Sequence, residues 1–193
     1  MQNKVNKNNC VKECSHIYPL KRSVEAINDK HFQELQGEIQ IYNVKQHNNL
    51  KVNSDTGKEI NGYDIYRCEK MSAQHRQFEI EYLLNGVNIM HYLALKKNTR
   101  VMCTINYNME NGICNGSQGI ITEFIETVEG EIPVVKFTNG LKKQLLPHYI
   151  QSDEYPSIAV GQIPLCLSWA MTIHKIQGAT MPMASIDVGG QIF

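Results

Sequence analysis

The densest run of chemistry-bearing side chains lies at residues 172–178, Thr-Ile-His-Lys-Ile-Gln-Gly, directly after the apolar segment 163–169. Thr172 offers a hydroxyl group, His174 a ring N–H and Lys175 a positive charge. Donors of these kinds bind phosphate oxygens, and backbone N–H groups at the start of a helix add to them. In open α/β sheets such groups lie where a strand ends and the chain turns into a helix. The pattern therefore predicts a phosphate-binding segment, while the residues alone leave a capped surface helix open as the alternative.

The cysteines are the next candidates for chemistry. Cys10, Cys14 and His16 could supply three zinc ligands, whereas zinc usually takes four. The other four cysteines stand singly in apolar segments, where a free thiol packs as a small apolar group. A thiol–imidazole pair of Cys166 and His174 lacks a positioned third group. We therefore expect no metal site, no cysteine catalysis and a reduced, intracellular protein.

Composition limits the class of protein. The 193 residues carry 19 Lys and Arg and 19 Asp and Glu, so the formal net charge is zero. This balance argues against binding by bulk positive charge but leaves room for a local basic groove. The apolar fraction of 42% is enough for a packed core. No apolar run approaches the roughly 18 residues of a membrane span, and we expect neither a membrane segment nor a secretory signal.

Hydrophobic periodicity predicts the elements that would position these residues. A strand is expected at 16–20, followed by a helix that runs from Ser23, a candidate N-cap, to about Leu35. A polar loop is expected at 46–62, and a short helix at 72–84. The other predicted elements are strands at 39–44, 92–95, 100–105, 163–169 and 185–188 and a helix at 170–177.

Between residues 114 and 146 the pattern changes to short apolar runs separated by Asn115-Gly116, Glu129-Gly130 and Asn139-Gly140. Such pairs are typical of hairpin turns. Strands of this length and spacing predict a small antiparallel barrel or meander. The order along the chain is then α/β, all-β and α/β, which an insertion into a single α/β domain explains most simply.

Three stretches, in this order, resemble superfamily 1 DNA helicases of the petite-integration-frequency (PIF) type. Residues 18–28 resemble the strand and helix of the family's motif IV, and residues 162–180 resemble its motif V. Between them, residues 93–119 resemble the family segment LKxGxxVM…RN…GLCNGTxG. Asn98 stands where relatives often have glycine, and an asparagine can adopt the same left-handed backbone geometry.

The resemblance implies an α/β fold: the second RecA-like helicase domain, a parallel sheet with flanking helices, and an inserted small antiparallel β-barrel. The expected divisions are a disordered or non-native N-terminus at 1–14, RecA-like parts at 15–99 and 162–193, and the barrel at 100–161. No G-x-x-x-x-G-K-S/T sequence occurs. Walker A, Walker B and motif VI are therefore expected to lie outside this chain, and we expect no ATP hydrolysis by it alone.

The resemblance also implies the activity: part of an ATP-dependent 5′-to-3′ DNA helicase that uses ATP and Mg²⁺ and pairs with an N-terminal RecA-like domain. The residues implied to contact single-stranded DNA are Thr172, His174 and Lys175. Those implied to lie near the nucleotide cleft, or to couple it to DNA, are Gln177, Gly178, Thr180, Asn28 and Arg22. An intracellular location is expected, in the nucleus or the mitochondrion if the host is eukaryotic, and the family implies roles in repair, recombination or telomere maintenance.

Two alternatives from other classes stay open, a non-enzymatic single-stranded nucleic-acid-binding module and an inactive gene remnant. Tyr149 and Tyr155 are candidates to stack on bases, whereas core packing is the expected role of Trp169. The adjacent Lys142 and Lys143 form the strongest basic pair of the predicted barrel, although a solvated strand face is favoured for them.

Overall fold

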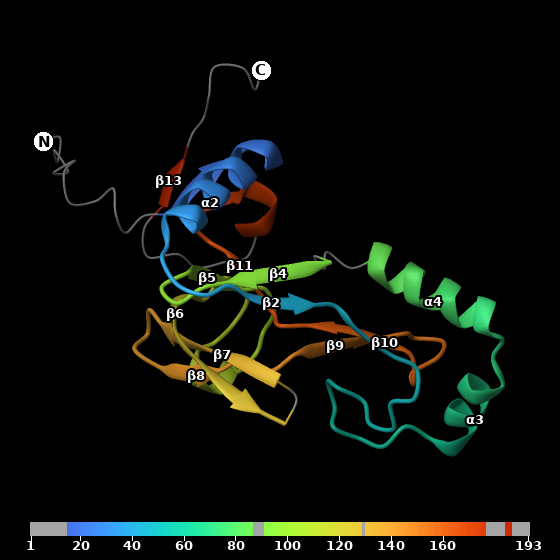
Figure 1. The fold of residues 1–193 in the computed structure, drawn as a ribbon. Coiled ribbons are helices and arrows are strands. Elements are labelled where there is room, and N and C mark those ends of the chain that lie inside the picture. Colours follow the sequence, from blue (N-terminus) through green and yellow to red (C-terminus); the bar gives the residue numbers. More distant parts are fainter. Residues whose placement is uncertain (1–14, 87–90, 129, 177–183, 187–193) are drawn as a thin grey trace, which may run out of the picture. The chain divides into compact units, whose positions relative to one another are not determined.

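The computed structural model describes residues 15–86, 91–128, 130–176 and 184–186, which form two compact units (Figure 1). Unit 1 contains Met1–Gln40, Leu95–Leu145 and Leu165–Phe193, and unit 2 contains Ile41–Ala94 and Leu146–Pro164. Each unit is therefore assembled from separate stretches of the chain. No helix of the described residues is long and apolar enough to cross a membrane.

A parallel sheet in unit 1 carries the residues singled out above. Its strands are β1 (Ser15–Tyr18), β12 (Ala170–Thr172) and β13 (Ala184–Ile186), in the order β12-β1-β13. β1 lies in the centre and runs parallel to both neighbours. Helix α2 (Lys21–Glu34) follows β1 and packs on β1 and β12. This part of the chain confirms the predicted α/β class.

Helix α2 buries one residue per turn. Its first helical hydrogen bonds go to the carbonyl of Leu20, which accepts from the N–H groups of Ser23 and Val24. Ser23 therefore lies inside the first turn and is not the N-cap, so that prediction was wrong. The helix starts earlier because the chain turns out of β1 directly after Tyr18. The buried face repeats every four residues and consists of Val24, Asn28 and Phe32.

Unit 1 also contains the short 3-10 helix η1 (Met109–Asn111) and a five-stranded antiparallel sheet. Its strands, in spatial order, are β11 (Leu165–Leu167), β5 (Arg100–Cys103), β6 (Gln118–Thr127), β7 (Gly130–Phe137) and β8 (Lys142–Gln144). Among the described strands β11 and β8 each have one neighbour, so the sheet is open and the predicted closed barrel at 100–161 is not confirmed. The strands of residues 100–161 also pair with a strand from outside this range, because β11 (Leu165–Leu167) is the neighbour of β5.

Two of the predicted turn signals connect strands of this sheet. Gly130 faces Thr127 at the end of the β6–β7 hairpin and has a φ of 106°. Gly140 has a φ of 90° and lies between β7 and β8, where its N–H donates to the carbonyl of Phe137. Both values lie in the left-handed region that glycine enters without steric cost, which explains why glycine follows Glu129 and Asn139.

A tight turn joins β4 (Tyr92–Leu95) to β5. The N–H of Thr99 donates to the carbonyl of Lys96, 3.1 Å away, and Asn98 between them has a φ of 69°. Asn98 N–H donates to the carbonyl of Ile121 on β6 at 2.8 Å. Asn98 therefore adopts the left-handed geometry that is open to asparagine, and the turn is fixed to β6.

Unit 2 is built on the antiparallel strands β3 (Lys45–His47), β10 (Ala159–Gln162) and β9 (His148–Gln151), with β10 in the centre. Strand β2 (Gln40–Asn43) pairs separately with β4. The hydrophobic core of this unit consists of Cys68, Ile80, Leu83, Tyr155, Ile158 and Val160.

Two helices contribute to that core. Helix α4 (Ala73–Gly86) matches the helix predicted at 72–84. Helix α3 (Gly62–Lys70) was not predicted. Its start carries a readable signal, because the side chain of Asn61 accepts a hydrogen bond from the N–H of Asp64 at 2.9 Å. Asparagine followed three residues later by an acidic residue is an N-terminal helix pattern.

Substitutions at Asn98 test the turn. Asn98→Val is expected to lower the free energy of unfolding by about 1–2 kcal/mol, because a β-branched residue is strained at positive φ. Asn98→Gly is expected to change it by less than about 0.5 kcal/mol, because relief of strain offsets the greater freedom of the unfolded chain. Urea unfolding followed by circular dichroism measures both. Lys97→Val, in the same exposed turn but at negative φ, is the control, and an equal loss in both valine variants would contradict the account.

Candidate functional site

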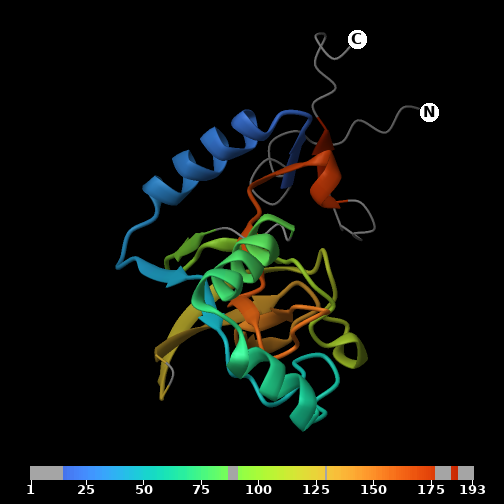
Figure 2. The ribbon, with the colours of Figure 1, turned by 90° about the vertical axis from the view of Figure 1, so that its right-hand side faces the viewer.

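The carboxyl ends of the parallel strands bring several predicted residues to one edge. Tyr18, the last residue of β1, is the register partner of Thr172, the last residue of β12. Helix α2 begins three residues after Tyr18, and the 3-10 helix η2 (Ile173–Ile176) follows Thr172 directly, so both leave this edge (Figure 2). Arg22 in the first turn of α2 and His174 in η2 are exposed. We call Tyr18, Arg22, Thr172 and His174 the carboxyl-edge site.

The chemistry of the carboxyl-edge site suits anions. Thr172 is half-buried and carries a hydroxyl group, and His174 and Arg22 present an imidazole and a guanidinium group to solvent. The N-cap residue of α2, Leu20, provides no capping side chain, and the first turn holds no acidic residue. The free N–H groups and the dipole of such a helix start favour negative charge. The edge is therefore suited to phosphate oxygens.

The remaining residues of the predicted phosphate-binding segment are only partly described. Lys175 belongs to η2, but its side chain is not described. Gln177, Gly178 and Thr180 lie outside the described residues, so their roles stay predictions. The strand predicted at 163–169 and the helix at 170–177 need correction. Two short strands, β11 and β12, occupy this stretch in different sheets, and the described residues that follow them, 173–176, form the 3-10 helix η2.

Asn28 holds β12 through both ends of its carboxamide. Its Nδ2 donates to the carbonyl of Ala170 at 2.9 Å, and its Oδ1 accepts from the N–H of Ala170 at 2.9 Å. On the other side of β12, the carbonyl of Trp169 accepts from His16 of β1. Asn28 therefore pairs with the outer edge of β12 as a neighbouring peptide group would. Its predicted place near a nucleotide stays a prediction, but its side chain already has a structural role.

Other sequence candidates in unit 1 have packing roles. Trp169 is buried and stacks on His31 with a ring separation of 5.8 Å, as its expected core role requires. Cys166 is buried. Cys103 is buried as well, and its burial raises the pKa of its thiol, so the Cys103 thiol stays protonated and unreactive. In the described part of the chain, no cluster of three or more His, Cys, Asp or Glu residues could hold a metal ion. Cys10 and Cys14 lie outside that part.

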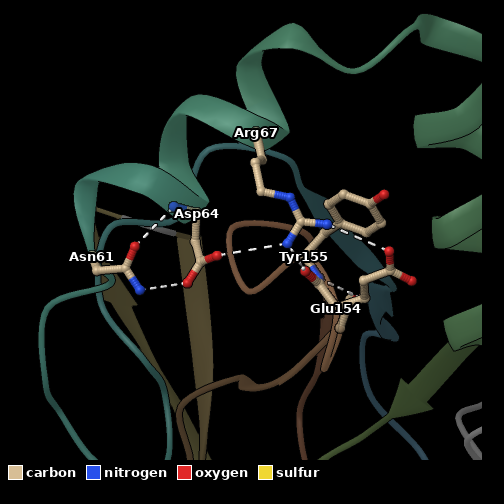
Figure 3. A network of polar contacts seen from close by, with 6 residues as sticks. Asn61, Asp64, Arg67, Glu154 and Tyr155 are labelled. Atoms are coloured by element: carbon tan, nitrogen blue, oxygen red, sulfur yellow. Dashed lines mark hydrogen bonds and ion pairs between the residues drawn. The ribbon is translucent and has the colours of Figure 1, made fainter.

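A polar network in unit 2 fixes Arg67 (Figure 3). The Nη1 and Nη2 atoms of Arg67 donate to the backbone carbonyl and to the Oε1 of Glu154, both at 3.4 Å. The guanidinium carbon lies 4.9 Å from the centre of the Tyr155 ring, and Asp64 lies 3.8 Å from Nη1. Tyr155 is buried beneath this cation, so it is not the exposed base-stacking residue that its loop position suggested.

The two other surface candidates also have partners. Tyr149 is half-buried, and its ring packs edge-on against the His47 ring with 4.7 Å between the ring centres. Lys142, one half of the predicted basic pair, forms an ion pair with Glu123 across the sheet. Its charge is therefore partly neutralised on that face.

An exposed aromatic and basic stripe on α3 was missed. Tyr63 and Tyr66 are 71% and 56% exposed, and the ammonium of Lys70 lies 5.6 Å from the centre of the Tyr66 ring. The spacing 63, 66, 70 places them on one helical face, which was readable once α3 is recognised as a helix. Exposed rings beside cations are typical of contacts to unpaired bases and of protein interfaces.

Comparison with known proteins now identifies the relationship. Residues 83–124 match the family "DNA helicase Pif1, 2B domain". ATP-dependent DNA helicase PIF6 of Trypanosoma brucei brucei is 35% identical over 151 residues, which are 72% of this chain and 19% of that protein. The structure of Pif1 helicase from Candida albicans aligns with a TM-score of 0.63 at 22% identity, over 100% of this chain and 42% of that chain. The structure of Bacteroides Pif1 bound to ssDNA aligns with a TM-score of 0.55 at 23% identity, over 98% of this chain and 37% of that chain.

These matches confirm the resemblance to Pif1-type DNA helicases, and the α/β fold of the chain resembles the solved Pif1 structures. The chain is homologous to one segment of longer proteins. It spans 16% to 23% of the length of the first curated relatives that it matches.

Removal of the Asn28 carboxamide tests the clamp on β12. Asn28→Ala is expected to lower the free energy of unfolding by about 2–4 kcal/mol, because the buried N–H and carbonyl of Ala170 lose their partners. Chemical unfolding followed by Trp169 fluorescence measures the loss. Asp29→Ala, exposed on the same helix, is the matched control and is expected to cost less than about 0.5 kcal/mol. Equal stability of the Asn28 variant and the unchanged chain would contradict the clamp.

Proposed function

We propose that this chain is the second motor segment of an ATP-dependent 5′-to-3′ DNA helicase, and that its carboxyl-edge site grips the phosphates of single-stranded DNA. The observation that carries the proposal is the register pairing of Tyr18 with Thr172. It brings the motif IV-like and motif V-like segments to one edge of a parallel sheet, where functional groups of α/β folds gather. In this proposal the parallel sheet and α2 belong to a RecA-like domain, and the five-stranded sheet is its insertion.

Three residues make the contacts of the proposed grip. The hydroxyl of Thr172 and a ring N–H of His174 donate hydrogen bonds to phosphate oxygens, and Lys175 adds a positive charge. Such contacts hold the sugar–phosphate backbone of DNA whatever its base sequence, as a translocating motor requires. The Bacteroides Pif1 structure that aligns with this chain is bound to ssDNA, which supports the same ligand here.

The nucleotide belongs to the intact enzyme in this proposal. The start of α2, with Arg22, no capping side chain and no acidic residue in its first turn, fits an anionic phosphate group. ATP with Mg²⁺, held between this segment and an N-terminal RecA-like domain, would supply the free energy for movement. Gln177, Gly178 and Thr180 are proposed to link that cleft to the DNA grip. If the host is eukaryotic, the enzyme would act on DNA in the nucleus or the mitochondrion.

A second candidate function is single-stranded nucleic-acid binding without a motor cycle, through the α3 stripe of Tyr63, Tyr66 and Lys70. The exposed rings and their neighbouring cation favour it, because bases stack on aromatic side chains without regard to sequence. Asp64 and Glu69 on the same short helix weaken the attraction to phosphates. The carboxyl-edge site therefore remains the first candidate.

Fluorescence anisotropy with a labelled oligothymidine at low salt separates the two. His174→Ala is expected to weaken binding at least about tenfold, because it removes one hydrogen bond to a charged group. His91→Ala, exposed in unit 2, is the matched control and is expected to leave affinity unchanged. If the paired change Tyr63→Ala and Tyr66→Ala abolishes binding while His174→Ala has no effect, the second candidate is correct. Absence of binding by the unchanged chain would contradict a DNA grip in this segment.

A further inference from the structure

Lys96 is a buried lysine whose ammonium group holds the end of a helix. Lys96 is only 6% exposed. Its Nζ atom donates hydrogen bonds to the carbonyls of Phe32 at 3.0 Å and Leu35 at 2.8 Å. Nζ also lies 4.8 Å from the centre of the Phe32 ring. Lysine is seldom buried to this degree. Here its charge complements the negative end of the α2 dipole, and its N–H groups donate to carbonyls at the helix end, of which that of Phe32 also accepts from Leu35 N–H.

The backbone of Lys96 is fixed to the five-stranded sheet. Its N–H donates to the Oγ1 of Thr99 at 2.9 Å, and its carbonyl accepts from Thr99 N–H. Thr99 is fully buried, and its own carbonyl accepts from Ile121 N–H on β6 at 3.0 Å. The turn therefore cannot shift without disturbing β6, and the ammonium of Lys96 transmits that fixed position to α2.

Helix α2 in turn fixes β12. Asn28 lies one turn before Phe32, and both face inward. Its carboxamide holds Ala170, which lies two residues before Thr172 of the carboxyl-edge site. Because an α-helix is a stiff body, a displacement of its carboxyl-terminal end moves Asn28 as well.

The chain just before this strand is held by separate contacts. Ser168 precedes β12, and its N–H donates to the carbonyl of Arg100 on β5 at 3.0 Å. The Oγ of Ser15 donates to the carbonyl of Ser168 at 2.9 Å. The start of β12 is thus tied to the five-stranded sheet and to β1. The side chain of Asn28 supports the outer edge of β12, and that support depends on the position of α2.

We propose that Lys96 is a positioning residue for the carboxyl-edge site and acts through α2 and Asn28. The ammonium group docks the end of α2 on the five-stranded sheet, and α2 then presents Asn28 to Ala170 at hydrogen-bonding distance. Loss of this contact loosens β12 and lets Thr172 and η2 depart from the phosphate-binding geometry. The DNA part of this inference rests on the proposed function, whereas the structural part does not.

Hydrogen exchange at the Ala170 amide tests the structural part directly, because that N–H donates to Asn28. Lys96→Met keeps the apolar stem but removes the donors, and it is expected to speed exchange at Ala170 about tenfold, in line with a lost bond to a charged group. Amides of the β6–β7 hairpin are expected to keep their rates. Lys96→Arg retains a cation with N–H donors and is expected to restore slow exchange. Lys136→Met, exposed on β7, is the matched control.

Two results would overturn the positioning role. One is unchanged exchange at Ala170 in Lys96→Met. The other is faster exchange spread equally over β6, β7 and β12, which would mean that Lys96 only stabilises unit 1. If Lys96→Met is poorly folded, Lys96→Gln, which keeps one donor group, is measured in the same way with the same two criteria.

A parallel measurement separates this inference from the proposed function. Oligothymidine anisotropy is expected to show severalfold weaker binding for Lys96→Met and recovery for Lys96→Arg. If the unchanged chain does not bind the oligonucleotide, the proposed function fails while the exchange data still decide the role of Lys96. If the chain binds and Lys96→Met binds equally well despite fast exchange at Ala170, the link from Lys96 to the carboxyl-edge site is overturned.

Discussion

The pair of hydrogen bonds between the Asn28 carboxamide and the backbone of Ala170 holds the strand on which the candidate site depends. β12 has three residues and, among the described strands, one neighbour, so backbone pairing alone gives it little support. Asn28 supplies the missing neighbour on the outer side, and Lys96 fixes the helix that carries Asn28. The position of Thr172 thus follows from a helix-to-strand contact, and a short strand can present binding groups without a wide sheet around it.

Local patterns predicted the elements that depend on local interactions. Periodicity located α2 and α4, apolar runs located β4 and β5, and glycine turns located the hairpins, because each pattern reflects the geometry of its own segment. The path of residues 165–172 could not be read in this way. Cys166 pairs with Met102 in one sheet, and Ala170 pairs with His16 in another, and both are long-range pairings that no local pattern encodes. The predicted barrel is not confirmed, because β11 joins β5 through one of these long-range pairings and the sheet of described strands is open.

The candidate site was predicted in part. The types and spacing of Thr172, His174 and Lys175 pointed to phosphate binding. The parallel register brings Tyr18 to the same edge, together with Arg22, which the resemblance had implied near the nucleotide cleft. The structural roles of Asn28 and Lys96 were not readable, because a buried amide or ammonium looks in sequence like any polar residue on a helix or in a turn. Only the fold shows which backbone groups they satisfy.

The proposed DNA grip is tested most directly by mapping the residues of this chain that single-stranded DNA contacts. A bromodeoxyuridine-containing oligothymidine can be cross-linked to the 193-residue protein by ultraviolet light, and the attached peptides identified by mass spectrometry. We expect cross-links at Thr172 and within η2, because Thr172 ends β12 at the carboxyl edge of the parallel sheet and η2 follows it directly. Cross-links confined to α3 and α4 of unit 2, with none at that edge, would contradict it.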